Sequence, residues 1–319
     1  MAQIQTVNGP IDPDDLGQTM IHEHIAVRTP GIAENWPDRW DRAATVERAG
    51  RLLSDAKNAG VGTIVDLTTA DMARDVPLIK EVATNAGVHT VVATGVYQPV
   101  PRYWHARDED DMASAFISEI TDGIADTGVR AGAIKMATDT GGEPDTGELI
   151  ETQEKALRAG ARAHRATGIP ILTHNGPPTT GLLQQRVFKE EGVELDGNVL
   201  IGHVGDTDDL DFLKKLADGG GFLGMDRFGL YMGLDEAAKV NTVVQLCKDG
   251  YAGSLALGHD ACGQLDWVAD INLMPDTWVY AHIAEVILPA LREGGVSDAD
   301  LNTMLVENPK RLLTPSNPY

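Results

Sequence analysis

Short apolar segments alternate with longer amphipathic segments along nearly the whole chain. Each apolar segment is bounded by Gly, Asp, Thr or Pro, and short, almost continuously apolar runs of this kind are typical of buried parallel strands. We therefore expect eight strands, at residues 19–25, 62–67, 89–94, 131–137, 169–173, 199–203, 221–225 and 254–257.

The segments between these strands have the spacing of helices that face a core. Several of them end just before a glycine, such as Gly60, Gly87 or Gly168. Glycine ends a helix easily because it adopts a left-handed conformation without strain. Six helices are predicted, at residues 43–59, 76–85, 147–167, 208–217, 235–248 and 277–292, with a further C-terminal helix at 298–306.

This alternation predicts a (β/α)8 TIM barrel, an α/β fold in which a helix follows each of eight strands. A doubly wound open sheet is the competing architecture, but no Gly-x-Gly-x-x-Gly turn follows the first strand, which disfavours its dinucleotide-binding version. No repeat or linker divides the chain, so we expect one barrel domain over residues 1–319. The longest irregular segments follow strands, which places them at the C-terminal rim where barrel enzymes build their active sites. They are residues 97–108, 139–146, 175–179 and 260–276.

The composition excludes several classes of partner. The net charge of −22 would repel nucleic acids and anionic membranes, and no apolar run reaches the ~18 residues of a membrane span. The N-terminal residues have no signal-peptide pattern, and two cysteines, Cys247 and Cys262, form no disulfide framework. We therefore expect a cytoplasmic enzyme whose substrate is neutral or uncharged at the reacting end, although acidic surfaces also simply favour solubility.

Residues able to bind a metal ion stand at the ends of several predicted strands. His22 and His24 end the first strand, and positions i and i+2 of a strand project to the same face. A metal ion is the commonest reason for this arrangement, but a surface pair without a metal is equally compatible with His-x-His alone. Because the C-terminal ends of barrel strands converge at one mouth, residues at the other strand ends should lie nearby. These residues are Lys135, His174, His203 and Asp260.

Lys135 is an unusual member of this set. An ammonium group among apolar neighbours is costly unless it is paired or neutralised, and a cationic lysine has no lone pair to offer a metal. Two explanations remain open. A neighbouring carboxylate pairs with Lys135, or CO₂ has converted the lysine to a carbamate whose two oxygens can bridge two metal ions.

Eight short segments, spread over essentially the whole chain, form a specific combination. They are Met20-Ile21-His22-Glu23-His24, Ala93-Thr94-Gly95-Val96-Tyr97, Ala133-Ile134-Lys135, Thr173-His174, Ile201-Gly202-His203, Gly224-Met225-Asp226-Arg227-Phe228-Gly229, His259-Asp260 and Val306-Glu307-Asn308-Pro309-Lys310-Arg311-Leu312. In this order they resemble the phosphotriesterase family of the amidohydrolase superfamily and, more narrowly, its phosphotriesterase-like lactonases.

The resemblance implies a barrel with two divalent metal ions, which the ligand types allow to be Zn²⁺, Co²⁺, Mn²⁺ or Fe²⁺. It assigns His22, His24 and Asp260 to one ion and His174 and His203 to the other. Lys135, carboxylated to N6-carboxylysine, would bridge the two ions together with a hydroxide.

The same resemblance gives roles to further residues. Asp260 would accept the proton of the nucleophile, and Tyr97 would stabilise a developing oxyanion. Arg227 would lie near the leaving side of a lactone, and Trp267 would line an acyl pocket. Simpler interpretations remain open for the last three: a packed rim aromatic, a surface salt bridge and a loop anchor, respectively.

The function implied by the resemblance is the hydrolysis of lactones, above all N-acyl-homoserine lactones, with promiscuous phosphotriesterase activity, by a homodimer. The alternatives are an organophosphate triesterase, a hydrolase of another ester or lactone, and a barrel that binds a metal or ligand without turnover. The last is disfavoured because binding alone requires neither Lys135 nor a proton-accepting Asp260 at an open metal centre.

Overall fold

The computed structural model describes residues 2–139 and 148–319. Its centre is a parallel sheet in the order β10-β9-β8-β7-β6-β5-β4-β3-β11. All eight predicted strands are present, and their ends agree with the prediction to within two residues. The strands are β3 (Gln18–Val27), β4 (Val61–Asp66), β5 (His89–Gly95), β6 (Ala133–Thr138), β7 (Ile171–Asn175), β8 (Val199–Ile201), β9 (Phe222–Met225) and β10 (Leu255–Leu257).

The sheet closes on itself between its last and first strands. A ninth segment, β11 (Cys262–Leu265), pairs in parallel with β3 and sets Cys262 opposite His24. Between β10 and β11 the backbone N–H of Asp260 donates to the carbonyl of His22 over 2.9 Å. The Glu23 carboxylate accepts the N–H groups of His259 (2.8 Å) and Ala261 (3.0 Å). The eighth strand of the barrel is therefore formed by β10 and β11 together, with an interruption at residues 258–261. The fold is the predicted (β/α)8 barrel.

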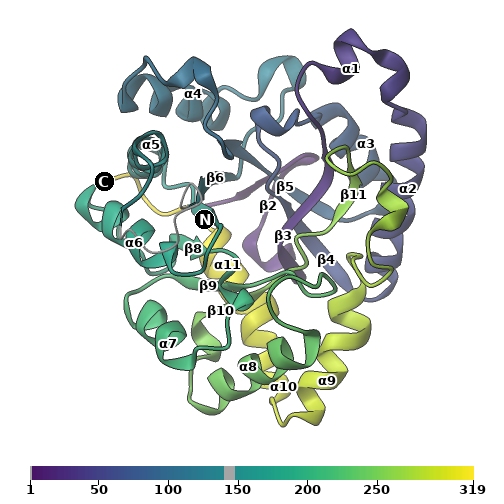
Figure 1. Ribbon diagram of the computed structural model, residues 1–319, viewed down its shortest axis with the longest axis vertical. Coiled ribbons are helices and arrows are strands. Elements are labelled where there is room, and N and C mark those ends of the chain that lie inside the picture. Colours follow the sequence, from purple (N-terminus) through teal and green to yellow (C-terminus); the bar gives the residue numbers. More distant parts are fainter. Residues whose placement is uncertain (1, 140–147) are drawn as a thin grey trace.

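Helices surround the strands on the outside of the barrel (Figure 1). Each of five of them begins at an aspartate whose carboxylate accepts a backbone N–H of the first turn, which satisfies a donor that the helix itself leaves unpaired. The helices are α1 (Ile32–Asn35), α2 (Arg42–Asn58), α3 (Val76–Ala86), α4 (Glu109–Thr121), α5 (Glu151–Thr167), α6 (Thr180–Glu190), α7 (Leu210–Asp218), α8 (Glu236–Lys248), α9 (Leu288–Glu293), α10 (Asp298–Asn302) and α11 (Asn308–Leu313).

The sequence prediction missed several elements. It omitted α4 and α6, the helices after the third and fifth barrel strands, and it omitted the N-terminal hairpin of β1 (Ile4–Thr6) and β2 (Gly9–Ile11). The aspartate cap Asp108, followed by three acidic residues of the first turn, was an available signal for α4. The hairpin strands have three residues each, too few to show a periodicity.

Three predicted helix boundaries also need correction. The helix expected from residue 147 begins at Glu151, and residue 147 and nearly all of the expected loop 139–146 lie outside the described residues. The helix expected over 277–292 starts as a π-helical turn at Ile283–Ile287 and continues as α9, because residues 277–281 form turns that contact the neighbouring loop. The C-terminal helix runs on through Thr303–Glu307 into α11.

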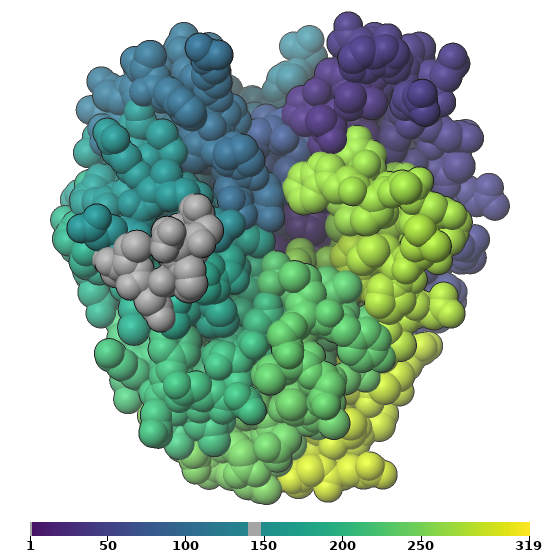
Figure 2. Space-filling model, in the orientation of Figure 1, coloured from purple at the N-terminus to yellow at the C-terminus, as the bar shows by residue number. Residues whose placement is uncertain are grey.

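Apolar side chains fill the barrel below its C-terminal mouth. Ala133 and Leu172 belong to the cluster of buried residues on the inward side of the strands. Side chains alternate across a strand, so Lys135 and His174, two positions further along β6 and β7, also point inward but at the level of the mouth. On the face shown in Figure 2 the surface is hollowed near the middle. None of the helices in residues 2–139 and 148–319 has the length and apolar character required to cross a bilayer.

Candidate metal centre

The six predicted ligand residues meet at the C-terminal mouth of the barrel. Lys135 Nζ lies 2.7 Å from Nε2 of His22, and Nδ1 of His174 lies 2.7 Å from Nε2 of His203. All four of these side chains are buried. Residues that are far apart in the sequence therefore point their nitrogen atoms into one small volume.

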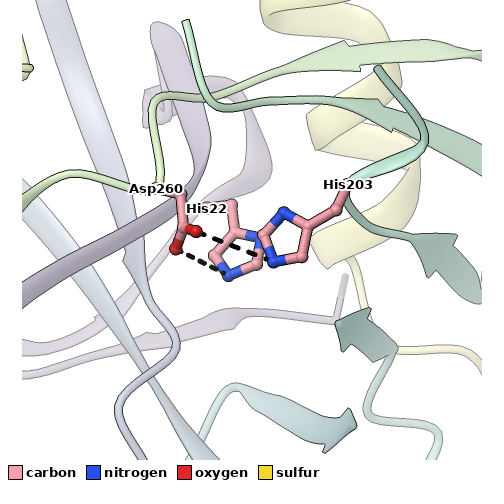
Figure 3. A group of neighbouring side chains, drawn as sticks. All are labelled: His22, His203 and Asp260. Atoms are coloured by element: carbon pink, nitrogen blue, oxygen red, sulfur yellow. Dashed lines mark ion pairs between the residues drawn. The ribbon is translucent and has the colours of Figure 1, made fainter. Parts of the chain in front are cut away.

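Asp260 faces the histidines across this volume. Its Oδ1 lies 3.3 Å from Nε2 of His24 and 3.5 Å from Nε2 of His22, and its Oδ2 lies 3.7 Å from Nε2 of His203. Figure 3 shows the carboxylate directed at the His22 and His203 rings. The ligand atoms of His22, His203 and Asp260 all lie within 4.8 Å of one another, which is close enough for them to contribute to one metal centre.

Asp226 orients two of the imidazole rings. Nδ1 of His22 donates to its Oδ2 over 3.0 Å, and Nδ1 of His203 donates to its Oδ1 over 2.8 Å. Because a proton is thus held on each Nδ1, each Nε2 keeps a lone pair for a ligand. His24 is oriented in the same way by Thr68, whose Oγ1 lies 2.9 Å from its Nδ1.

Three residues of the site have a strained backbone conformation. His203, Arg227 and Asp260 have φ angles of 58°, 64° and 53°, in the left-handed region that residues other than glycine rarely adopt. Each follows the end of a barrel strand, and each such conformation costs roughly 1–3 kcal/mol. The contacts of Glu23 with residues 259 and 261 hold one of these turns in place. These unfavourable φ angles lower the stability of the folded protein, but they direct the three side chains toward the mouth of the barrel.

Burial sets the protonation states that a metal centre requires. It lowers the pKa of His22 to about 3, so this imidazole is neutral at pH 7. It lowers the pKa of Lys135 to about 7, although Asp260 and Asp226 oppose the shift. Burial alone would raise the pKa of Asp260, but His203, His22 and Arg227 hold it well below its usual value. A neutral imidazole at His22, an ionised carboxylate at Asp260 and a readily deprotonated amine at Lys135 fit a divalent cation.

Tyr97 and Trp267 form one wall of the site. The Tyr97 hydroxyl lies 3.5 Å from Nε2 of His174, and burial raises the pKa of this phenol to about 12, so it remains a hydrogen-bond donor. The Trp267 ring stacks on the Tyr97 ring with centroids 5.7 Å apart, while half of its own surface stays exposed. Tyr97 therefore both packs against a neighbour and points its hydroxyl at His174, one of the predicted ligands.

Arg227 lies inside the site rather than on the surface. Its side chain is 8% exposed, its Nε donates to Asp260 Oδ2 over 3.1 Å, and its Nη1 donates to Asp206 Oδ2 over 2.5 Å. The interpretation of Arg227 as a plain surface salt bridge is therefore wrong. Asp206 was not identified from the sequence, and its position three residues after His203 was the only signal for it.

A cavity of about 300 Å³ opens above the ligand residues. Polar groups gather at its base, where Lys135, His174 and Asp260 lie, and Tyr97, Arg227 and Trp267 contribute to its walls. The remaining wall is apolar and includes Val27, Met72, Leu230, Leu265, Met274 and Trp278. The arrangement suits a small, mainly apolar molecule with one polar group at the base.

Comparison with known proteins identifies this architecture. Residues 2–313 match the family model described as the phosphotriesterase family. The chain belongs to the phosphotriesterase family. A phosphotriesterase homology protein of Mycobacterium tuberculosis (strain ATCC 25618 / H37Rv) is 41% identical over 333 residues, which cover 100% of both chains. An aryldialkylphosphatase of Saccharolobus solfataricus is 37% identical, over 95% of this chain and 97% of that protein.

A solved structure supports the same assignment at the level of the fold. The phosphotriesterase from Mycobacterium tuberculosis superimposes with a TM-score of 0.92 at 42% identity, covering 99% of this chain and 100% of that one. Membership of the phosphotriesterase family makes the protein a hydrolase. The resemblance found in the sequence is thus confirmed for the family and the fold.

Proposed function

We propose that the protein is a metal-dependent lactonase that opens N-acyl-homoserine lactones and hydrolyses phosphotriesters weakly. The observation that carries the proposal is the cavity of about 300 Å³, which has metal-type donors and the Tyr97 hydroxyl at its base and apolar side chains around them. A lactone has one polar carbonyl to place at the base and an acyl chain to place against an apolar wall.

The donor set fits two divalent ions, Zn²⁺, Co²⁺, Mn²⁺ or Fe²⁺. We assign His22, His24 and Asp260 to one ion and His174 and His203 to the other, with Lys135 as an N6-carboxylysine between them. The pKa of about 7 supports this role for Lys135, because only an uncharged amine can add CO₂. When bound, such ions polarise an ester oxygen and make water a nucleophile near neutral pH.

The side chains around the ions have separate tasks in this proposal. Asp260, ionised and within 3.1 Å of Arg227 Nε, accepts the proton of the attacking water. Tyr97 donates a hydrogen bond to the oxygen that becomes negative as the carbonyl is attacked. Trp267 contacts the acyl chain with its exposed ring. We also propose that the protein acts as a homodimer, which light scattering would test.

An organophosphate triesterase is the second candidate. It is favoured by the aryldialkylphosphatase relative, whose name describes hydrolysis of a phosphotriester. Lactones and phosphotriesters can use the same nucleophile and the same electrophilic ions, so a single site can hydrolyse both. The two candidates differ in which substrate class gives the higher kcat/KM.

The test is a set of rate measurements on lactones of increasing acyl-chain length and on paraoxon, with protein loaded with Zn²⁺, Co²⁺ or Mn²⁺. We expect kcat/KM to be at least tenfold higher for the best lactone than for paraoxon, and a chelator to abolish both activities. Higher kcat/KM for paraoxon would favour the triesterase. Full activity in protein shown by elemental analysis to be free of metal would contradict both candidates.

A further inference from the structure

A buried lysine outside the cavity contacts the loop that carries Arg227. Lys239 lies in α8, and its side chain is 2% exposed. Its Nζ donates to the carbonyls of Arg227 (2.9 Å) and Leu230 (3.1 Å) and lies 3.4 Å from Oδ1 of Asp206. The two carbonyls accept hydrogen bonds from the ammonium group, and the Asp206 carboxylate pairs with its charge as an ion pair. The contacts compensate the cost of burying this charge.

Two of these contacts stabilise an unfavourable turn. Arg227 has a φ of 64°, and the N–H of Leu230 donates back to its carbonyl over 3.2 Å. Lys239 contacts the first and the last carbonyl of this turn at the same time. A strained backbone persists only where its surroundings determine it. Lys239 supplies that constraint from the helix behind the loop.

The third contact links Lys239 to the site through charged groups. Asp206 uses Oδ1 toward Lys239 and Oδ2 toward Arg227 Nη1, and Arg227 uses Nε toward Asp260. Lys239 does not line the cavity, so it would act on a substrate only through these neighbours. A continuous series of contacts therefore connects Lys239 in α8 with Asp260, the carboxylate that we assign to proton transfer.

We propose that Lys239 is a positioning residue for hydrolysis, which holds the Arg227 turn and thereby keeps the Arg227 guanidinium against Asp260. The catalytic part of this proposal depends on the proposed function, whereas the structural part does not. A lysine that only stabilised α8 would affect the melting temperature without acting through Arg227. The two cases are therefore separable by experiment.

The first experiment is a double-mutant cycle with Lys239→Met and Arg227→Met. We expect Lys239→Met to lower kcat/KM 10- to 100-fold, mainly through kcat, in the otherwise wild-type protein and by less than threefold in the Arg227→Met background. The control is Lys248→Met, at an exposed lysine of the same helix, which should leave kcat and KM unchanged. Equal losses in both backgrounds would overturn the proposal, because a coupled pair is not additive.

The second experiment needs no substrate. Hydrogen–deuterium exchange should accelerate at least tenfold at the backbone amides of residues 227–234 in Lys239→Met, but not in Lys248→Met. Lys239→Gln, which is shorter and keeps a donor, serves if the methionine variant does not fold, and the same acceleration is expected. Unchanged exchange in this segment would overturn the proposal. If the wild-type protein hydrolysed neither lactones nor paraoxon, the proposed function would fail while this result still decided the role of Lys239.

Discussion

Lys135 illustrates how a single buried residue indicates chemistry. Its amine lies 2.7 Å from the His22 ring and has a pKa of about 7 because burial disfavours its charge. The sequence left two explanations open, a carboxylate partner or a carbamate. Asp226 and Asp260 both favour the charged form of Lys135, yet burial outweighs them. The carbamate therefore suits this environment better than a lasting ammonium, since its negative charge would be shared with the metal ions.

Replacing the lysine that we propose as the bridge gives a direct test at this scale. If Lys135 carries the proposed carbamate, Lys135→Ala should lose at least one of the two proposed metal ions and at least 99% of the activity, because alanine would supply no carboxylate oxygens to the site. A short carboxylic acid such as propionate should restore part of both, since it supplies the missing carboxylate. Metal stoichiometry is measured by elemental analysis. The bridge would be refuted if the variant bound as much metal as the wild-type protein.

At the scale of elements, the strands were predictable and their connections were less so. Continuous apolar runs define the barrel strands because both faces of each strand are buried. The helix α6 is half polar and begins without a side-chain cap, so its sequence carries no clear start signal. The turn before β11 depends on Glu23 contacts across a gap of 236 residues, which no local pattern contains.

Two loops at the rim of the barrel, one carrying Arg227 and one carrying Thr277, are in close contact at Gly229. This residue has a φ of 81°, and a β-carbon added to it would come within 2.2 Å of the carbonyl oxygen of Thr277 in the neighbouring loop. Gly229 also donates its N–H to Glu236 of α8 over 3.1 Å. The Arg227 loop and the segment around Thr277 are therefore in close backbone contact at this position.

Gly229→Ala should lower the free energy of unfolding by roughly 2–5 kcal/mol, through the clash with backbone and the unfavourable φ. It should also lower kcat/KM, because the turn carries Arg227. Gly253→Ala is the matched control, since a β-carbon there meets nothing within 4 Å and its φ is ordinary. Denaturant unfolding and steady-state kinetics measure the two effects. Equal stability of the two variants would show that the two loops do not pack closely at this position.

For the whole molecule, the sequence indicated most of the proposed metal site but few of the residues that support it. The six proposed ligand residues follow from strand ends and the convergence of a barrel. Asp206 and Lys239 contact residues of other structural elements, and neither belongs to a recognisable sequence motif. Lys239 did have a weak signal, because it shares a helical face with Val243 and Leu246, which are both buried. Such long-range ion pairs can be recognised only once the fold brings the elements together.

The base of the barrel provides a pH-dependent contribution to stability that is independent of the metal site. His164 of α5 is buried, its Nδ1 donates to the carbonyl of Ile169 over 2.8 Å, and its Nε2 accepts from the Tyr319 hydroxyl over 2.9 Å. Burial lowers the pKa of His164 below 6.5, the ordinary value for histidine. This pair connects the C-terminal residue to α5, where the Tyr319 N–H also donates to the Arg165 carbonyl.

The sign of the effect follows from where the proton binds. As the pH falls below 6.5, the unfolded chain binds more protons at this histidine than the folded protein does, because the pKa is lower in the folded state. The contribution of neutral His164 is therefore complete above pH 6.5 and is lost as the pH falls toward the folded-state value. His164→Gln, which cannot titrate, should flatten this dependence, and other acid-sensitive groups cancel when the two proteins are compared. The free energies of unfolding of the wild-type protein and of His164→Gln are measured between pH 5 and 8. The difference between the two proteins should change by up to about 1.4 kcal/mol for each pH unit below 6.5. A difference that did not change with pH would show that His164 is not the residue responsible.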